Sequence, residues 1–187
     1  MLPVARRSIL SAWVMLGFCS AIARGGERHP GSFALRAESS GWTATYIRPP
    51  QPATPVSIDG KTYNLFESSP SASPADSGSP LLPVEVLSLG IPFDAEITVE
   101  LRDPVYEIER NQLIAPVPGY RGTDEGEAIA VYRKDPAAYA ADRFFPGREL
   151  WVDPTITLRS QRIAAVHLAP LQYNPATRVL RRLVRGT

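Results

Sequence analysis

The chain has 187 residues and an almost balanced charge, with 20 Lys and Arg residues against 19 Asp and Glu residues. This balance provides no basic surface of the kind that nucleic-acid-binding domains use, so we expect no nucleic-acid partner. The single cysteine, Cys19, excludes a disulfide within the chain, and the 19 prolines disfavour long helices. Stability must therefore come from a packed core.

Residues 1–23 have the pattern of a cleavable signal peptide. Two arginines precede an apolar stretch at 9–22, and Ala21 and Ala23 supply an Ala-x-Ala cleavage signal. We expect cleavage after Ala23 and export to the extracellular space or the cell envelope. A lipoprotein signal ending at Cys19 is disfavoured, because the bulky Phe18 stands where a small residue is needed.

Cleavage would remove two basic residues and leave 18 against 19 acidic ones, a formal charge of −1. No later segment is long and apolar enough to predict a membrane span, so we expect no membrane anchor after cleavage. Residues 24–37 are predicted to be a short linker and residues 38–187 a single domain. Within that domain, the Pro/Ser-rich stretches 49–57 and 68–80 are predicted to be solvated loops.

Apolar and polar residues alternate with a period of two in several short segments, which predicts half-buried β-strands. In one of them Ile97, Val99 and Leu101 alternate with charged or polar residues. Residues 81–91 are apolar on both faces, as expected of a central strand. The predicted strands lie at 42–46, 61–66, 81–91, 97–101, 106–108, 127–133, 150–152 and 155–159.

The end of the chain predicts a β-hairpin. Asn174 and Pro175 occupy positions that favour a turn, between strands expected at 163–171 and 178–184. Four arginines of the second strand, at 178, 181, 182 and 185, are interpreted as charges that protect a sheet edge. One short helix is predicted at 135–142, with Asp135 as its N-cap. Together the segments predict an all-β fold, an antiparallel, jelly-roll-like β-sandwich.

The residues that could carry chemistry are few. After the leader the chain contains no cysteine and only His29 and His167, so it offers neither a Cys–His nucleophile pair nor a zinc site. We expect no metal and no cofactor. Glu107 and Glu109 could act as paired carboxylates, but their spacing is that of a solvated strand face. The sequence therefore predicts a domain that is not an enzyme and has no catalytic residue.

Three short motifs in order, spread over most of the chain, resemble the N-terminal propeptides of gingipain-type cysteine peptidases. They are Ser40-Gly41-Trp42-Thr43, Gly78-Ser79-Pro80-Leu81-Leu82-Pro83-Val84 and Pro170-Leu171-Gln172-Tyr173-Asn174-Pro175. The resemblance implies a β-sandwich that keeps a secreted cysteine endopeptidase latent and assists its folding. The implied partner is the cognate peptidase catalytic domain, in cis or in trans.

The catalytic half of such a peptidase is absent from this sequence. The chain is therefore either a piece of a longer cysteine-type endopeptidase or a stand-alone relative of the propeptides. The alternative from another class is a secreted, non-catalytic binding or adhesion module, or a free-standing inhibitor. Its support is the fold class together with three aromatic residues that could be exposed, Phe144, Phe145 and Trp151.

The resemblance also implies that a basic side chain points towards the specificity pocket of the peptidase. The segment 118–134 is selected because its glycines permit an extended loop that can reach into a cleft. Arg121 lies near its tip, and Arg133 and Lys134 form a second candidate and a dibasic cleavage point. These three residues are the predicted peptidase contacts.

Overall fold

The computed structural model describes residues 33–187, except 39–40, 49–50, 67–75 and 123–125. The predicted signal peptide with Ala21 and Ala23, and most of the Pro/Ser-rich stretch 68–80, lie outside the described residues. Within them the chain forms thirteen strands and one short helix, and every pairing between named strands is antiparallel. The all-β prediction, with one short helix, is confirmed.

The larger sheet, which we call the base sheet, has five strands. Its order is β1–β2–β13–β12. Strands β2 and β12 pair with one edge of β13, and β6 pairs with the opposite edge. The strands are β1 (Phe33–Glu38), β2 (Gly41–Ile47), β6 (Val105–Glu109), β12 (Leu171–Asn174) and β13 (Val179–Gly186).

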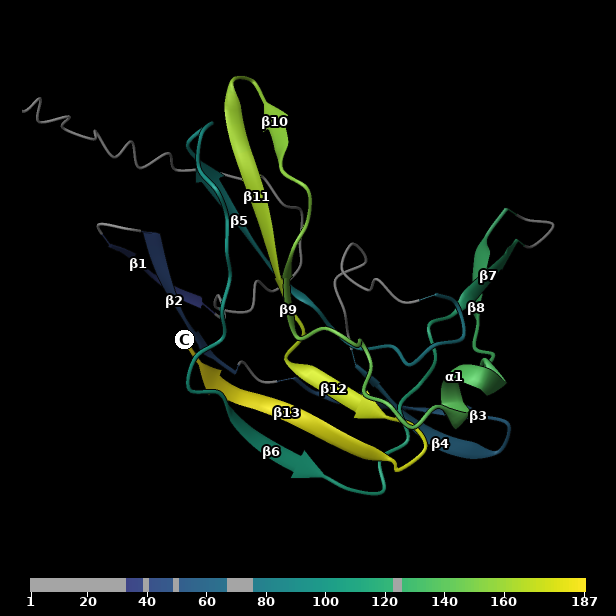
Figure 1. The fold of residues 1–187 in the computed structure, drawn as a ribbon. Coiled ribbons are helices and arrows are strands. Elements are labelled where there is room, and N and C mark those ends of the chain that lie inside the picture. The colour runs from purple at the N-terminus through teal and green to yellow at the C-terminus, as the bar shows by residue number, and fades with distance from the viewer. Residues whose placement is uncertain (1–32, 39–40, 49–50, 67–75, 123–125) are drawn as a thin grey trace, which may run out of the picture.

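The second sheet, which we call the wing, has four strands and rises from the base sheet (Figure 1). Strand β11 lies at its centre, with β5 on one side and both β9 and β10 on the other. Pro154 lies between β9 and β10 and cannot donate to a ladder, which splits this edge into two short strands. The strands are β5 (Glu85–Ile91), β9 (Leu150–Val152), β10 (Ile156–Leu158) and β11 (Gln161–Leu168).

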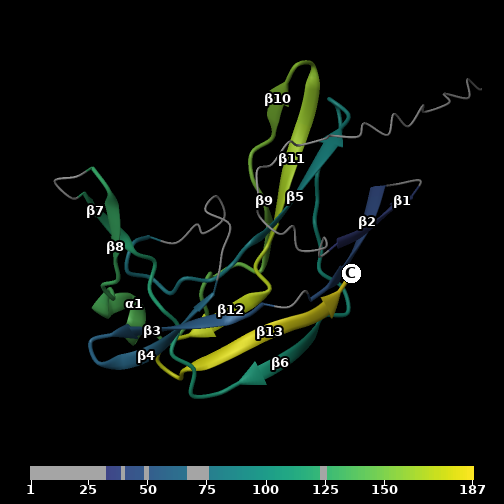
Figure 2. The same cartoon turned by 180° about the vertical axis from the view of Figure 1, so that it is seen from behind.

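Two hairpins complete the fold. One pairs β3 (Ala53–Ile58) with β4 (Lys61–Phe66), and the other pairs β7 (Gly119–Gly122) with β8 (Ala128–Val131). Helix α1 (Pro136–Ala140) follows β8, and its N-cap Asp135 accepts a hydrogen bond from the Ala137 N–H at 2.9 Å. Figures 1 and 2 both show the β7–β8 hairpin and the wing rising on the same side of β12 and β13.

Strand β13 joins the parts of the core. Leu180 and Leu183 are three positions apart in the strand, so their side chains point to opposite faces of the sheet. Both are 0% exposed. Leu180 packs in a cluster with Phe66, Ile114 and Tyr173, whereas Leu183 packs with other residues of the base sheet and the wing. The strand is therefore buried on both faces.

The predicted hairpin at the end of the chain is confirmed at its turn and corrected in its first strand. The Thr177 N–H donates to Asn174 Oδ1 at 3.2 Å, as expected for an Asn-initiated turn. The predicted strand 163–171, however, breaks at Ala169 and Pro170, since β11 belongs to the wing and β12 to the base sheet. The chain thus passes from one sheet to the other at a buried proline.

Three predictions for residues 53–101 are wrong. Residues 53–57, expected in a solvated loop, belong to β3, which tolerates Pro55 because it pairs with β4 alone. The alternating residues 97–101 form no strand, because no described strand pairs with them. Residues 81–84 are buried but precede β5, and β5 is an edge strand of the wing rather than a central one.

Three further predictions differ from the structure. Strand β1 begins at Phe33, inside the segment 24–37 that was expected to be a linker. Trp42, at the start of the predicted half-buried strand 42–46, is 53% exposed because it lies at the outer end of the β1–β2 hairpin. The arginines of β13 do not protect an edge, since β13 is a central strand and Arg182 makes an ion pair with Glu109 at 2.6 Å.

Truncation of Leu180 should test the central role of β13. Leu180→Ala removes a fully buried side chain and leaves a cavity, so we expect a loss of about 3 kcal/mol in the free energy of unfolding. The control is Ile108→Ala on the neighbouring β6, which is half exposed and should change stability by less than about 1 kcal/mol. Urea unfolding measures both, and equal losses would contradict the assignment.

Buried tyrosines should make the fold sensitive to alkaline pH. Burial raises the pKa of Tyr173 to about 12, whereas the hydroxyl of an unfolded tyrosine has a pKa of about 10. Above pH ~10 the unfolded chain therefore loses a proton that the folded chain keeps, and stability falls as the pH rises towards ~12. Urea unfolding across this range should show the fall and a flatter curve for Tyr173→Phe. Substitution of the exposed Tyr120 by Phe should leave the curve as it is in the wild type.

Candidate docking site

The predicted loop 118–134 forms a projecting hairpin. Arg121 lies on β7 opposite Ile129 of β8, and Gly119 lies opposite Val131. Because side chains of a strand alternate between faces, Arg121, Ile129 and Val131 share one face of the hairpin. All three are exposed, and the Arg121 side chain has no ion pair or hydrogen bond with another described residue. The hairpin therefore presents one cation flanked by two aliphatic side chains.

The structure separates the other two predicted contacts. Arg133 follows β8, is exposed, and its side chain makes no ion pair or hydrogen bond with a described residue. Lys134 turns inward, where its Nζ donates to the Tyr63 hydroxyl at 2.9 Å and lies 5.4 Å from the centre of the same ring. The hydrogen bond with Tyr63 raises the pKa of Lys134. Of the three predicted residues, Arg121 and Arg133 are available to a partner, and Lys134 is held within the domain.

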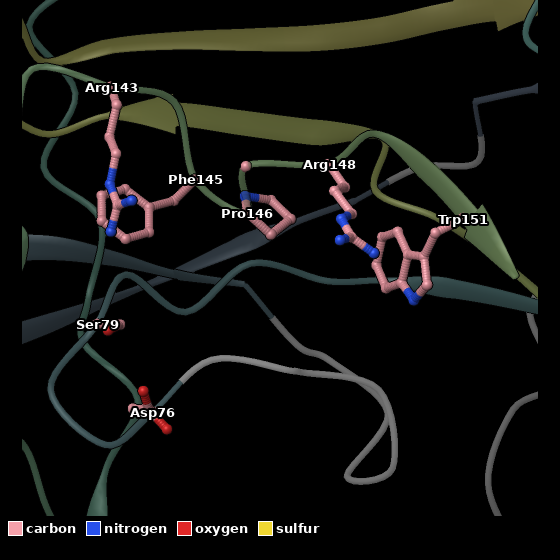
Figure 3. A pocket seen from close by; sticks show the side chains of 8 residues that line it. Asp76, Ser79, Arg143, Phe145, Pro146, Arg148 and Trp151 are labelled. Carbon is pink, nitrogen blue, oxygen red and sulfur yellow. The ribbon is translucent and has the colours of Figure 1, made fainter. Parts of the chain in front are cut away.

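A cavity of about 370 Å³ lies beside the wing, next to Trp151 (Figure 3). Arg143, Phe145 and Arg148 line it from one segment, Trp151 of β9 closes one end, and Asp76 lies on the opposite side. The Arg143 guanidinium lies 4.8 Å from the centre of the Phe145 ring. The cavity thus combines aromatic walls with two guanidinium groups, an arrangement that suits a carboxylate.

The remaining polar candidates are engaged in internal contacts. Glu107 makes an ion pair with Arg48, and Glu109 makes one with Arg182, so the two carboxylates stabilise the base sheet rather than form a free acid pair. His167 has its Nε2 2.8 Å from an Asp153 carboxylate oxygen. Its ring stacks on Trp151 with the ring centres 5.0 Å apart.

A second internal cluster surrounds Arg181. Its guanidinium lies 4.7 Å from the centre of the Tyr106 ring and 3.6 Å from a Glu149 carboxylate oxygen. The Tyr106 hydroxyl donates to Glu149 at 2.8 Å, and burial, followed by this bond, raises the pKa of Tyr106 to about 12. These groups fix the base sheet against the segment that leads into β9.

The described residues offer few other candidate sites. No group of acidic, histidine or cysteine side chains in that part of the chain could hold a metal ion. The described helix is also too short and too polar to cross a membrane.

Sequence reasoning missed Arg143 and Arg148. The signal was present in Arg143-Phe144-Phe145-Pro146-Gly147-Arg148, where two cations flank aromatic residues and a Pro-Gly turn. The aromatic residues of this stretch were considered as an exposed binding surface, but Phe145 and Trp151 are only partly exposed and pack against buried clusters. The missing information was which side chains meet across the cavity, since Asp76 and Trp151 are distant in the sequence.

The family model of Propeptide_C25 matches residues 26–185, which is most of the chain. The chain belongs to this family. Among curated proteins, gingipain R1 of Porphyromonas gingivalis is 37% identical over 109 residues, which are 57% of this chain and 11% of that protein. Gingipain R2 of the same organism is 33% identical over 109 residues, 57% of this chain and 14% of that protein. The chain thus spans a small part of the curated relatives it matches.

Two solved structures of gingipain systems share the fold. The complex of the pro- and mature domains of Porphyromonas gingivalis RgpB matches with a TM-score of 0.73 and 25% identity, covering 85% of this chain and 82% of that one. A structure on the zymogenic latency of gingipain K matches with a TM-score of 0.63 and 22% identity, over 82% and 86% of the two chains. The chain is a propeptide domain of the gingipain type, as its three ordered motifs predicted.

The contrast between Arg133 and Lys134 should appear in stability. Lys134→Ala removes the hydrogen bond and the ring contact with Tyr63, so we expect a loss of about 1 kcal/mol in the free energy of unfolding. Arg133→Ala removes the same charge one residue earlier and should change stability by less than about 0.5 kcal/mol. Chemical unfolding of the two variants under one condition measures the difference. Equal stabilities would show that the Tyr63 contact contributes nothing.

Proposed function

We propose that this domain keeps a secreted cysteine peptidase latent and assists its folding. The family assignment supports this, as does the relative solved as a complex of pro- and mature domains. The observation that carries the proposal is the projecting β7–β8 hairpin with its exposed cation. The partner is a gingipain-like catalytic domain, either further along the same polypeptide or on a separate chain.

The hairpin is suited to the inhibitory contact because its backbone is already ordered. Backbone pairing of β7 with β8 fixes Arg121 before binding, so less conformational freedom is lost when the side chain enters a pocket. Ile129 and Val131 on the same face can exclude water around a cation that meets a carboxylate. Arg121 is therefore our candidate for the pocket anchor, and Arg133 is a candidate contact or processing site.

The remaining features follow the same proposal. Residues 1–23 are proposed to direct export and to be removed after Ala23, which would place the domain outside the cell or in its envelope. The base sheet and the wing are proposed to form the two layers of a jelly-roll-like sandwich. The domain itself carries out no catalysis, and a full-length protein that contained it would be a cysteine-type endopeptidase.

Inhibition of a peptidase tests the proposal. The purified chain should inhibit mature gingipain R1, and Arg121→Ala should raise the inhibition constant about thirtyfold or more, the expected effect of losing a pocket anchor. Arg133→Ala, beyond the end of β8 at the root of the hairpin, should raise it by less than about tenfold. If Arg121→Ala inhibits like the wild type, the hairpin is not the anchor. If the wild type does not inhibit, the latency proposal fails.

A further inference from the structure

One face of the wing is apolar and has no covering element among the described residues. The strand registers place six apolar side chains on this face, which we call the wing face: Val86, Trp151, Ile156, Leu158, Ile163 and Ala165. Ile156 is 62% exposed and Leu158 is 58% exposed. On the opposite face, Ala164 and Leu168 are buried. The wing therefore buries one face in the domain and presents the other to the outside.

The composition of the wing face is unusual for a solvated sheet. An antiparallel sheet that meets water on one side normally carries polar and charged side chains there. The strand positions on this face include no Lys, Arg, Asp or Glu, and their polar residues are Ser88, Gln161 and His167. His167 is stacked on Trp151 and has its Nε2 2.8 Å from an Asp153 carboxylate oxygen. A contiguous apolar surface of this kind marks a contact site for another macromolecule.

The wing face continues into the cavity and from there to the hairpin. Trp151 belongs to the wing face and also lines the cavity. On the far side the cavity is lined by Asp76 and Ser79, and the Gly78 N–H between them donates to the Val117 carbonyl just before β7 at 2.9 Å. The wing and the hairpin also rise on the same side of the base sheet (Figures 1 and 2). A single body docked against the hairpin can therefore reach the wing.

The cavity adds charge to this surface. Arg143 contacts the Phe145 ring, and neither it nor Arg148 makes an ion pair with a described residue. Asp76 on the facing side is exposed and makes no ion pair with either of them. Two guanidinium groups beside aromatic walls favour an acidic side chain of the partner, because a guanidinium binds a carboxylate through paired hydrogen bonds.

We propose that the wing face and the adjoining arginine cavity form a second docking surface for the peptidase catalytic domain, separate from the β7–β8 hairpin. The partner would present an aliphatic patch to Ile156 and Leu158 and an acidic side chain to Arg148. This inference rests on the proposed function. In this arrangement the wing contributes affinity, whereas the hairpin occupies the specificity pocket of the peptidase. Loss of the wing contact should therefore weaken binding but leave the contact between the hairpin and that pocket unchanged.

The test measures inhibition of mature gingipain R1 by the full chain. The double variant Ile156→Asp/Leu158→Asp should raise the inhibition constant about thirtyfold or more, and Arg148→Glu about tenfold. The matched control is Ile47→Asp on the base sheet, an isoleucine that is 65% exposed and lies outside the wing face. It should inhibit like the wild type. Circular dichroism and urea unfolding establish that all variants keep the fold.

The outcomes separate the two proposals. If the wild type inhibits and the wing variants inhibit equally well, the wing proposal is overturned while the latency proposal stands. Equal weakening by Ile47→Asp would also overturn it, since the effect would not belong to the wing. Sedimentation velocity of the chain alone tests whether the wing face is instead a contact between two copies of the chain. If the wing variants convert a dimer to a monomer and leave inhibition unchanged, the face is a contact between copies of this chain.

Discussion

Burial of β13 on both faces and both edges is the constraint on which the rest of the domain depends. Leu180 and Leu183 fill separate clusters on opposite sides of the strand, while β12, β6 and β2 pair with its edges. Arg181 and Arg182 of the same strand are half-buried, and each meets an aromatic ring and a carboxylate. A strand in this position holds the base sheet together and gives the wing a fixed foundation.

From that foundation the domain extends two elements with different chemistry. The β7–β8 hairpin carries an exposed arginine on a narrow, preformed support, and the wing carries a broad apolar face. A narrow cationic projection suits a pocket, whereas a broad apolar face suits a larger area of contact. The cavity with Arg143 and Arg148 adjoins the wing at Trp151, and the wing and the hairpin rise on the same side of the base sheet.

The sequence predicted features that depend on neighbouring residues and failed where distant residues decide. The turn at Asn174, the cap at Asp135 and strand β4 were predicted correctly, because turn chemistry and alternation are local. Strand β3 was missed because Pro55 suggests a loop unless its edge position is known. The alternation of apolar and polar residues also predicted a strand at 97–101, but this segment has no partner strand in the described fold. Alternation in one segment gives no information about which other strand pairs with it. For the site, exposure of Arg121 followed from its glycine neighbours, but the inward turn of Lys134 depends on Tyr63, 71 residues away.

The position of β13 in the chain has a consequence for the order of folding. Its pairing with β2 joins Ile47 to Arg185, residues 138 positions apart. Contacts of such large sequence separation form slowly, because the intervening chain must be ordered before they contribute. The base sheet is therefore incomplete until the last strand of the domain has been synthesised. A chain that lacks residues 179–186 has no central strand for its base sheet, so the native fold can form only once this segment is present.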